Sequence, residues 1–306
     1  MARIVVIGEG MLELVRTGES WKLGYGGDTL NTAIHLARAG HDVAYLTALG
    51  SDPLSADVKA QWAAEGLDTS VVLDHPSAST GLYAISTDAA GERSFAYWRD
   101  TSAARQMFAL PGIGIALAQA EQADLVVHSL ITLAILPADA RQQLLALCRR
   151  VRARGGKVAF DGNYRPRLWP GIDDARAARD AAIACADIGL PTLEDEAMLS
   201  TDADADAVAR HWSDLGCAET IVKLGRDGCR LPDGSILPPP ATLSPVDTSG
   251  AGDAFNGGYL AARMDGASVR DAAMAGHRLA GWCVMRAGAI PARDGAAAYP
   301  HPTDRG

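Results

Sequence analysis

The sequence contains little positive charge. Its 306 residues include 28 lysines and arginines against 37 aspartates and glutamates, which gives a formal net charge of -9. Binding to nucleic acid or to an anionic membrane requires a basic face, so this balance disfavours both as main partners. It remains compatible with a small anionic substrate that is held by a few local arginines.

Long hydrophobic runs and paired cysteines are also missing. The longest apolar stretch, residues 125–136, is interrupted by His128, Ser129 and Thr132 and is too short to span a bilayer. The five cysteines are odd in number, scattered and without a C-x-x-C pair, which is typical of reduced core thiols in a cytoplasmic protein. The first apolar run ends at Ile7, so we expect a buried strand there and not a signal peptide.

What the sequence does contain is a repeated alternation of strand-like and helix-like segments. Residues 3–8 are typical of a strand, and residues 28–40 of an amphipathic helix that Gly40 ends. The pattern predicts further strands at 42–50, 123–129, 157–163, 187–191 and 219–225, and further helices at 52–66, 138–154, 175–185, 204–215 and after Gly252. Repeated β-α units predict an α/β fold with a doubly wound, mostly parallel sheet and helices on both faces, in one domain over residues 1–306.

One stretch breaks this alternation. Residues 80–99 alternate polar and apolar side chains around a turn at Asp88–Gly91, which predicts a β-hairpin. We expect the segments 11–25 and 78–100 to form one small sheet inserted in the α/β domain. Such a sheet would act as a lid over the carboxyl ends of the parallel strands, where doubly wound folds bind ligands.

The segment DTSGAGDAFNGGYL at residues 247–260 places three small residues directly before an aspartate and a helix. The first amides of that helix, on Gly250, Ala251 and Gly252, would have no partners within the helix. Together with the helix dipole they would form an anion site beside Asp253. This pairing suits phosphoryl transfer to a hydroxyl whose proton the aspartate receives. The alternative is an ordinary helix start with a first-turn carboxylate.

The same segment resembles the C-terminal signature of the pfkB, or ribokinase-like, carbohydrate kinases at every signature position. Residues 26–40, GGDTLNTAIHLARAG, resemble the N-terminal signature of that family except at Thr29, where a smaller residue is usual. Three segments are similar to the corresponding segments of the 2-keto-3-deoxygluconate kinases within the family. They are GGDTLN at the start of the N-terminal signature, residues 81–105, and NYRPRLW at residues 163–169. The resemblance covers residues 3–295.

The resemblance implies a ribokinase-like fold and ATP-dependent phosphorylation of 2-keto-3-deoxygluconate at its terminal hydroxyl, with Asp253 as general base. ATP and Mg²⁺ are the implied cofactors, and copies of the chain are expected to pair through the lid sheet. A fructokinase, a ribokinase or a keto-deoxygalactonate kinase remains an alternative, because the residues do not determine the stereochemistry at C4 of the sugar.

Two other classes of protein are disfavoured. A dinucleotide-binding oxidoreductase would need a third glycine that GEGMLE at residues 8–13 lacks. A non-catalytic sugar-binding protein would have no use for the intact Asp253.

Two arginines are candidates for recognising an acid sugar. A guanidinium binds a carboxylate through two parallel hydrogen bonds, so Arg99 beside Tyr97 on the lid could form a clamp with Arg165, which follows a strand end. For Arg99 the alternative is a solvated edge arginine. Tyr83 resembles a substrate contact of the acid-sugar kinases, with core packing as its alternative. Further sugar contacts carried over from the family, with helix capping by Asp28 as the alternative, are Gly26, Gly27, Asp28, Thr29 and Asn31.

The nucleotide is expected near the turn KLGRDG at residues 223–228, because the family places ATP there; an ordinary β-turn is the alternative. For a metal, Asp195 occupies the acidic position of the family's N-x-x-E motif while Thr192 replaces its asparagine, so Mg²⁺ is expected to bind mostly through water and ATP phosphates. Asp247 falls where relatives bind a monovalent cation such as K⁺. The ATP contacts carried over from the family are Asn163, Lys223, Gly225, Gly228, Gly250, Gly252 and His277.

Overall fold

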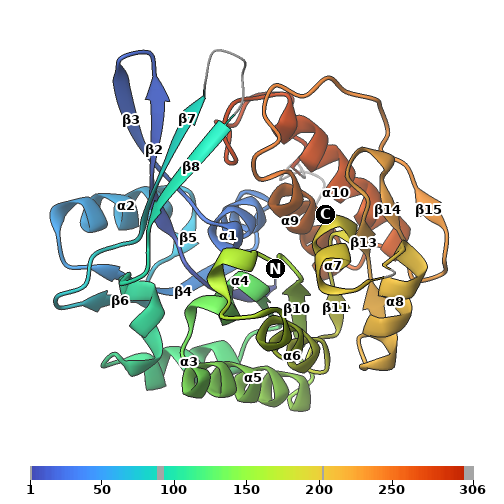
Figure 1. The fold of residues 1–306 in the computed structure, drawn as a ribbon, viewed down its shortest axis with the longest axis horizontal. Helices are drawn as coiled ribbons and strands as arrows, with labels where there is room; N and C mark the ends of the chain where they lie inside the picture. Colours follow the sequence, from blue (N-terminus) through green and yellow to red (C-terminus); the bar gives the residue numbers. More distant parts are fainter. Residues whose placement is uncertain (1, 88–92, 202, 300–306) are drawn as a thin grey trace.

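The computed structural model describes residues 2–87, 93–201 and 203–299, and its centre is one eight-stranded sheet. The strands of this sheet are β1 (Arg3–Ile7), β4 (Asp42–Gly50), β5 (Leu67–Asp68), β6 (Val72–His75), β9 (Leu125–Ser129), β10 (Lys157–Asp161), β11 (Ile188–Gly189) and β12 (Glu219–Thr220). They run in the order β12-β11-β10-β9-β1-β4-β5, with β6 also paired to β4, and their pairings are parallel (Figure 1). The predicted parallel sheet is confirmed.

Helices cover both faces of this sheet (Figure 1). They are α1 (Asp28–Arg38), α2 (Pro53–Ala64), α3 (Ile113–Glu121), α4 (Leu130–Ile135), α5 (Ala138–Ala153), α6 (Ile172–Ile183), α7 (Leu193–Leu199), α8 (Ala205–Asp214), α9 (Ala251–Met264) and α10 (Val269–Val284). Successive side chains of a strand point to opposite faces, so β1 serves two cores. Ile4 and Val6 pack with α1, α2, α9 and α10, whereas Val5 and Ile7 pack with α3, α5, α6 and α8. Among the helices in the described ranges, none combines the length and apolarity that a bilayer crossing requires.

A second sheet of four strands projects from the main one, as the dark-blue and teal arrows of Figure 1 show. Its strands are β2 (Met11–Thr17), β3 (Ser20–Gly26), β7 (Leu82–Thr87) and β8 (Arg93–Trp98), in the order β3-β2-β7-β8. The pairs β2–β3 and β7–β8 are antiparallel hairpins, and the central pair β2–β7 is parallel. The pairing of the predicted hairpin is confirmed, and its turn at Asp88–Gly91 lies outside the described residues.

A third, three-stranded sheet is not predicted by the sequence. It consists of β13 (Val222–Lys223), β14 (Cys229–Arg230) and β15 (Ile236–Leu237), paired antiparallel. The segment 219–225, expected as one strand, is divided at Ile221: its first part joins the main sheet and its second part joins this small one. Two-residue strands have no periodicity that a sequence pattern could detect, which explains the difference.

Candidate active site

The start of α9 lies against the start of α1, and this contact brings together the two ends of the candidate site. The side-chain amide of Asn31 donates to Oδ2 of Asp253 at 2.7 Å, although the two residues are 222 positions apart in the chain. Asn31 is 5 % exposed and Asp253 9 % exposed. The residues that the sequence predicts for sugar binding and for catalysis are therefore neighbours.

Gly250 forms the turn into α9 and has no room for a side chain. Its φ is +68°, and a Cβ there would lie 2.6 Å from the Cβ and 2.9 Å from the Cα of Ala289. Helix α9 begins at Ala251, so the amides of its first turn lie on Ala251, Gly252 and Asp253. Contrary to the prediction, the amide of Ala251 already has an acceptor: it donates to the carbonyl of Thr248 at 3.3 Å because the chain folds back in a tight turn. Of the predicted amides, that of Ala251 is therefore engaged, and an anion site at Gly252 and Asp253 stays a prediction.

The carboxyl group of Asp253 has a strongly perturbed acidity. Its pKa is raised to about 8: burial is the main cause, the negative charges of Asp28 and Asp161 add to it, and the hydrogen bond from Asn31 and the charge of Lys223 oppose the shift. A carboxylate with a pKa near physiological pH is a far better base than an ordinary aspartate. Beside the first-turn amides of α9, it can accept a proton from a hydroxyl while an anion forms next to it.

Two asparagines near Asp28 have unused acceptors. The amide of Asn163 donates to Oδ2 of Asp28 at 3.3 Å, and burial raises the pKa of Asp28 while a hydrogen bond from Ser129 lowers it. Within the described ranges, the buried Oδ1 atoms of Asn163 and Asn31 have no hydrogen-bond partner. Such atoms suit a ligand rich in hydroxyl donors. The structure thus places Asn163 beside the predicted sugar contact Asp28, and its predicted contact with the nucleotide stays a prediction.

The side chain of Thr29 points into the core and not toward a ligand. It is 3 % exposed, and its hydroxyl forms a 3.0 Å hydrogen bond with the hydroxyl of Tyr45. A Cβ at Gly8 would collide with this threonine, so the absence of a side chain at Gly8 makes room for it. This packing explains why Thr29 is tolerated where the resemblance leads one to expect a smaller residue. A contact of Thr29 with the sugar would therefore use its backbone, and it stays a prediction.

The neighbouring glycines are required by their surroundings. A Cβ at Gly26 would collide with the hydroxyl of Tyr83 on the lid sheet. Gly27 has a φ of +145°, and a Cβ there would collide with the carbonyl oxygen of Glu9. The backbone before α1 is therefore held close to both the lid and the end of β1.

Two tyrosines line the lid sheet on the side of Asp253. The rings of Tyr83 and Tyr97 are stacked with centroids 6.0 Å apart, and the hydroxyl of Tyr83 donates to Glu13. Burial raises the pKa of Tyr83, and the charges of Glu13 and Asp253 add to the effect, which places the ring near the candidate base. Tyr97 is half-exposed. Tyr83 also packs with Met11, as the core-packing alternative expects. This packing is compatible with a position near Asp253.

Arg99 does not lie on the lid as the sequence predicts. Strand β8 ends at Trp98, and the next residue enters the molecule, where Arg99 is 7 % exposed and forms an ion pair with Glu9. The hydroxyl of Ser102 donates to the other carboxylate oxygen of Glu9. The alternative of a solvated edge arginine is therefore wrong, and an exposed clamp on the lid face is corrected to a buried guanidinium beneath it. The charge of Arg99 lowers the pKa of Asp28, so it still lies on the sugar side.

Arg165 pairs with the predicted metal ligand. Its guanidinium lies 3.0 Å from Oδ1 of Asp195 and donates to the carbonyl of Tyr164 at 2.7 Å, while half of its side chain stays exposed. Burial raises the pKa of Asp195. Within the part of the chain that the structure describes, no cluster of three or more His, Cys, Asp or Glu side chains is arranged to hold a metal ion. A divalent cation would therefore depend on phosphate and water ligands.

Asp247, the predicted cation ligand, joins two loops. Its carboxylate accepts from the amide of Ser249 at 2.8 Å and from the amide of Gly288 at 2.9 Å. These bonds tie the segment before α9 to the chain that follows α10. A contact with a monovalent cation stays a prediction.

Residues 223–228, where the sequence predicts the nucleotide, form a turn, and the nearby His277 is already engaged. Gly225 and Gly228 have φ values of +60° and +106°, and their turn separates β13 from β14. His277 is buried against Phe255, and its Nε2 lies 3.1 Å from the carbonyl oxygen of Leu237. Contacts of these residues with a nucleotide stay predictions.

Four acidic or amide side chains at the site are missed by sequence reasoning: Glu9, Glu13, Asp161 and Asn256. Glu9 ends an apolar run and is 1 % exposed, a combination that could have pointed to a buried ion pair. Asp161 ends β10 and accepts from both Lys223 and Asn256. A carboxylate at the carboxyl end of a buried parallel strand is the signal that could have found it.

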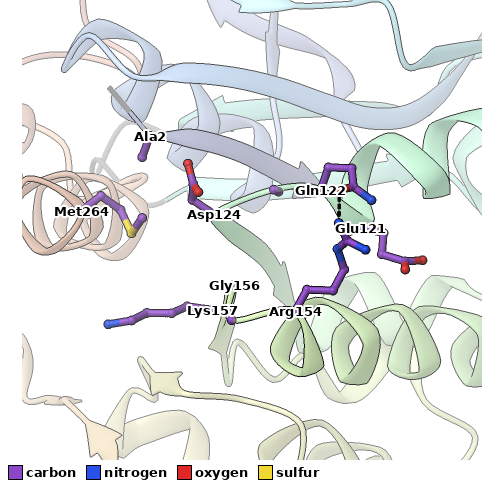
Figure 2. A pocket seen from close by; sticks show the side chains of 10 residues that line it. Ala2, Glu121, Gln122, Asp124, Arg154, Gly156, Lys157 and Met264 are labelled. Carbon is purple, nitrogen blue, oxygen red and sulfur yellow. Dashed lines mark hydrogen bonds between the residues drawn. The ribbon is translucent and has the colours of Figure 1, made fainter.

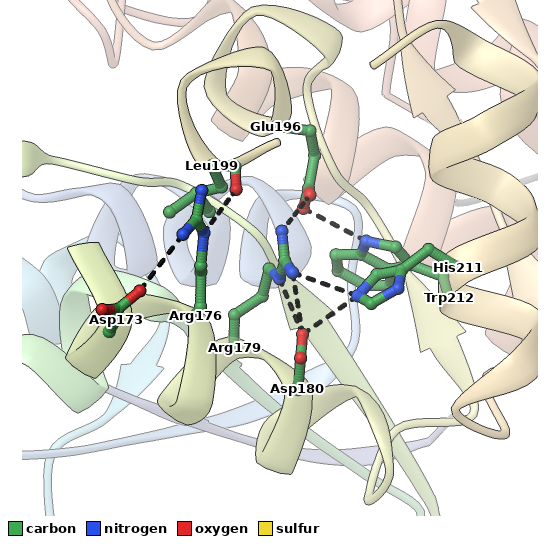
Figure 3. Close-up of polar contacts among 8 residues, drawn as sticks. All are labelled: Asp173, Arg176, Arg179, Asp180, Glu196, Leu199, His211 and Trp212. Carbon is green, nitrogen blue, oxygen red and sulfur yellow. Dashed lines mark hydrogen bonds and ion pairs between the residues drawn. The ribbon is translucent and has the colours of Figure 1, made fainter. Parts of the chain in front are cut away.

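A buried polar network supports α7, which carries Asp195 (Figure 3). The next residue, Glu196, is 1 % exposed and accepts from the guanidinium of Arg179 at 2.8 Å and from the indole of Trp212 at 3.1 Å. The ring of Trp212 stacks on Phe160 of β10 with centroids 5.5 Å apart. The network therefore holds α6, α7 and α8 against the strand that ends in Asp161.

An open cavity of about 510 Å³ lies at the other end of the sheet, at the amino ends of β1, β9 and β10 (Figure 2). Acidic and basic side chains line it together, and Arg154 donates to Gln122 across it. None of the candidate site residues lines this cavity. Its mixed charge indicates no class of ligand.

The model of the pfkB family carbohydrate kinases matches residues 1–294 of the chain. A 2-dehydro-3-deoxygluconokinase of Dickeya dadantii is 42% identical over 297 residues, which cover 94% of this chain and 96% of the relative. The protein of the same name from Escherichia coli K12 is 39% identical over 302 residues, 95% and 98% of the two chains. Among solved structures, aminoimidazole riboside kinase from Salmonella enterica, complexed with aminoimidazole riboside and an ATP analog, has a TM-score of 0.80 at 25% identity and covers 99% of this chain and 98% of its own.

Proposed function

The chain belongs to the pfkB family of carbohydrate kinases, and from this premise we propose that it transfers a phosphoryl group from ATP to 2-dehydro-3-deoxygluconate, the 2-keto-3-deoxygluconate named above. The acceptor is the terminal hydroxyl, and the product is the 6-phosphate. The observation that carries the proposal is Asp253, a buried carboxyl of raised pKa that lies between Asn31 and the first-turn amides of α9.

In this reaction Asp253 is the general base. Its ionised carboxylate takes the proton of the terminal hydroxyl as that oxygen forms a bond to the γ-phosphorus, and the bond from this phosphorus to the bridging oxygen of ADP breaks. The amides of Gly252 and Asp253 and the ammonium of Lys223 stabilise the charge on the phosphoryl oxygens. ADP leaves with the electron pair of the broken bond.

The sugar is held on the side of α1. Asp28, Asn31 and Asn163 offer acceptors to its hydroxyls, two of which are the amide oxygens without a protein partner. The backbone of Gly26 and Gly27 lies beneath it, and the rings of Tyr83 and Tyr97 cover it from the lid. Arg99 and Arg165 bind its carboxylate, because a charge-assisted pair of hydrogen bonds both holds and orients an acid sugar.

ATP suits the other side of the cleft. Lys223 and the start of α9 supply positive charge for its phosphates, and the turn at Gly225 and Gly228 lets the backbone approach the ribose. Mg²⁺ would neutralise charge on the phosphates, held mostly by phosphate and water, and Asp195 would reach it only by giving up its ion pair with Arg165. A monovalent cation such as K⁺ would bind at the loops that Asp247 joins.

A panel of acceptor sugars tests this function. With ATP and Mg²⁺, 2-dehydro-3-deoxygluconate should give the highest kcat/KM, above its galactonate epimer, fructose and ribose, as followed by ADP release. A higher value for fructose or ribose would overturn the acid-sugar assignment and favour a neutral-sugar kinase.

Replacing Arg165 with alanine should raise the KM for the sugar acid by about 10–100-fold, because a charge-assisted hydrogen bond contributes roughly 1.5–3 kcal/mol. The KM for ATP should change by less than about threefold, since nucleotide contacts are left intact. Steady-state kinetics with each substrate varied in turn measures both. Arg167→Ala is the matched control, because Arg167 is exposed on the same loop and has no proposed role. Equal rises in both KM values would contradict a carboxylate clamp.

We further propose that two copies pair through the outer face of the lid sheet. Trp21, Leu23 and Trp98 are 50%, 43% and 61% exposed, and the strand register places them on the face opposite Tyr83. A groove of about 930 Å³ that includes Leu12 and Trp98 continues this face toward the core. Large exposed apolar patches mark association sites.

Sedimentation measures this association directly. The wild type should behave as a dimer, and the double variant Trp21→Glu with Trp98→Glu as a monomer. A monomeric wild type would overturn the proposal.

Five free, buried cysteines and the use of ATP support the cytoplasm as the location of the protein.

A further inference from the structure

Three buried polar side chains form a closed ring beside Asp253. The ammonium of Lys223 lies 3.2 Å from Oδ1 of Asp161 and 3.1 Å from Oδ1 of Asn256. The amide nitrogen of Asn256 donates to Oδ2 of Asp161 at 2.8 Å and closes the ring. The three residues come from β13, β10 and α9, which lie far apart in the sequence.

The ring leaves the ammonium little freedom. Asp161 and Lys223 are each 7% exposed and Asn256 is 2% exposed, and a buried charge persists only where a partner compensates it. Because the nitrogen of Asn256 is bonded to the carboxylate, its oxygen must face the cation. Two of the three donors of Lys223 are thereby engaged, and its third N–H remains for another acceptor.

The remaining donor has an anion-binding neighbour. The Nζ of Lys223 lies 3.6 Å from where a Cβ on Gly252 would be, and Gly252 belongs to the first turn of α9. A cation and the positive end of a helix dipole repel each other unless negative charge lies nearby. Asp161 supplies one such charge, and a phosphoryl group between the ammonium and the amides would supply the other.

We propose that Asp161 and Asn256 are positioning residues that hold the ammonium of Lys223 against the phosphoryl group during its transfer. Asn256 lies three residues after Asp253, so both side chains lie on one face of α9. One helix thus carries the base, first-turn amides and the amide that orients the cation. The inference rests on the proposed kinase function.

The ring also lies within the electrostatic reach of the base. The charged groups that act on Asp253 are Asp28 and Asp161, which raise its pKa, and Lys223, which lowers it, while the neutral Asn31 donates a hydrogen bond to it. Removing the charge of Asp161 and removing the charge of Lys223 should therefore move the acidity of Asp253 in opposite directions. A pair of opposite shifts would show that the charges of the ring reach the base, and the kcat of Asn256→Ala tests whether the ring also positions the ammonium.

The pH profile of kcat/KM for the sugar tests this inference, because its acid limb reports the base in the free enzyme. Asp161→Asn should move the limb to lower pH, and Lys223→Met should move it to higher pH. Asn256→Ala should leave the limb in place and lower kcat by about 10–50-fold, with the KM for the sugar changed less than about twofold. The matched control is Arg263→Met, which removes a 2.6 Å ion pair with Glu219 at the far end of α9 and should change neither limb nor kcat.

The inference would be overturned if the acid limb of the pH profile did not move in Asp161→Asn and Lys223→Met, or if it moved in the same direction in both. A wild-type kcat in Asn256→Ala would also overturn it. If Asp161→Asn fails to fold, Asn256→Asp replaces it: a second carboxylate beside Lys223 should move the limb to higher pH, and an unmoved limb counts against the ring. The sugar preferred in the acceptor panel is used, so a wrong sugar assignment does not affect the outcome.

Discussion

Replacing Asp253 with asparagine should lower kcat by about 10²–10⁴-fold, because the variant has no group to receive the proton of the hydroxyl. Binding of ATP should change by less than about threefold, since the amides of α9 remain in place. A coupled assay for ADP gives kcat, and titration calorimetry with a non-hydrolysable analogue of ATP gives the affinity. Turnover within about tenfold of the wild type would remove Asp253 from the role of base.

The stability of the same variant supplies the control. The folded protein keeps the proton of Asp253 up to a pH of about 8, whereas an unfolded chain releases it near 3.8. This group therefore lowers the stability of the wild type progressively as the pH rises between those values. Asp253→Asn lacks the buried charge, so its Tm should rise relative to the wild type between pH 5 and pH 9, which differential scanning calorimetry can follow. A Tm difference that does not grow with pH would contradict the raised pKa.

Replacing Arg179 with methionine should lower the free energy of unfolding by about 3–5 kcal/mol, because it leaves the charge of Glu196 buried without a partner. Glu196 is 1% exposed, and after the change only the indole of Trp212 would still donate to it. Urea unfolding followed by tryptophan fluorescence measures the loss. The double variant with Glu196→Gln should recover most of it, since the neutral pair has no stranded charge.

The matched control lies one turn earlier on the same helix. Arg176 pairs with Asp173 at 3.1 Å, where 90% of the aspartate side chain is exposed, and it also donates to the carbonyl of Leu199 at 2.7 Å. Arg176→Met leaves no charge buried, so it should cost no more than about 2 kcal/mol. A loss as large as that in Arg179→Met would show that the methionine itself, and not the buried charge, disrupts α6.

The main sheet and its helices could be predicted because their signals are local. Alternating runs such as residues 3–8 and 28–40 carry their own periodicity, and parallel strands joined by helices allow few topologies. Asp253 could be found for the same reason, since small residues, aspartate and helix follow one another in a single segment. The contact with Asn31 could not, because 222 residues separate the two partners.

The wrong position of Arg99 has a specific physical cause. Alternation with period two continues through Tyr97 in the sequence, and nothing in the letters indicates that β8 ends at Trp98. The burial of Arg99 depends on Glu9, which is 90 residues away and lies in the loop between β1 and β2. The ring of Asp161, Lys223 and Asn256 escapes sequence reasoning in the same way. Lys223 is predicted as an ATP contact, but nothing in the sequence indicates that Asp161 and Asn256, which lie 62 and 33 residues from it, are its partners.

The position of α9 and α10 in the chain has a consequence for biosynthesis. All eight strands of the main sheet are complete by Thr220, yet two of the four helices that cover the side of Ile4 and Val6, α9 and α10, follow only after Gly250. When the ribosome has translated β12, part of the apolar surface of the sheet is still exposed to solvent. Such an exposed surface favours aggregation, which chaperones prevent. Asp253, the proposed base, is thus among the last parts to be translated, and a message truncated before its codon yields a chain without this carboxyl and with part of its core uncovered.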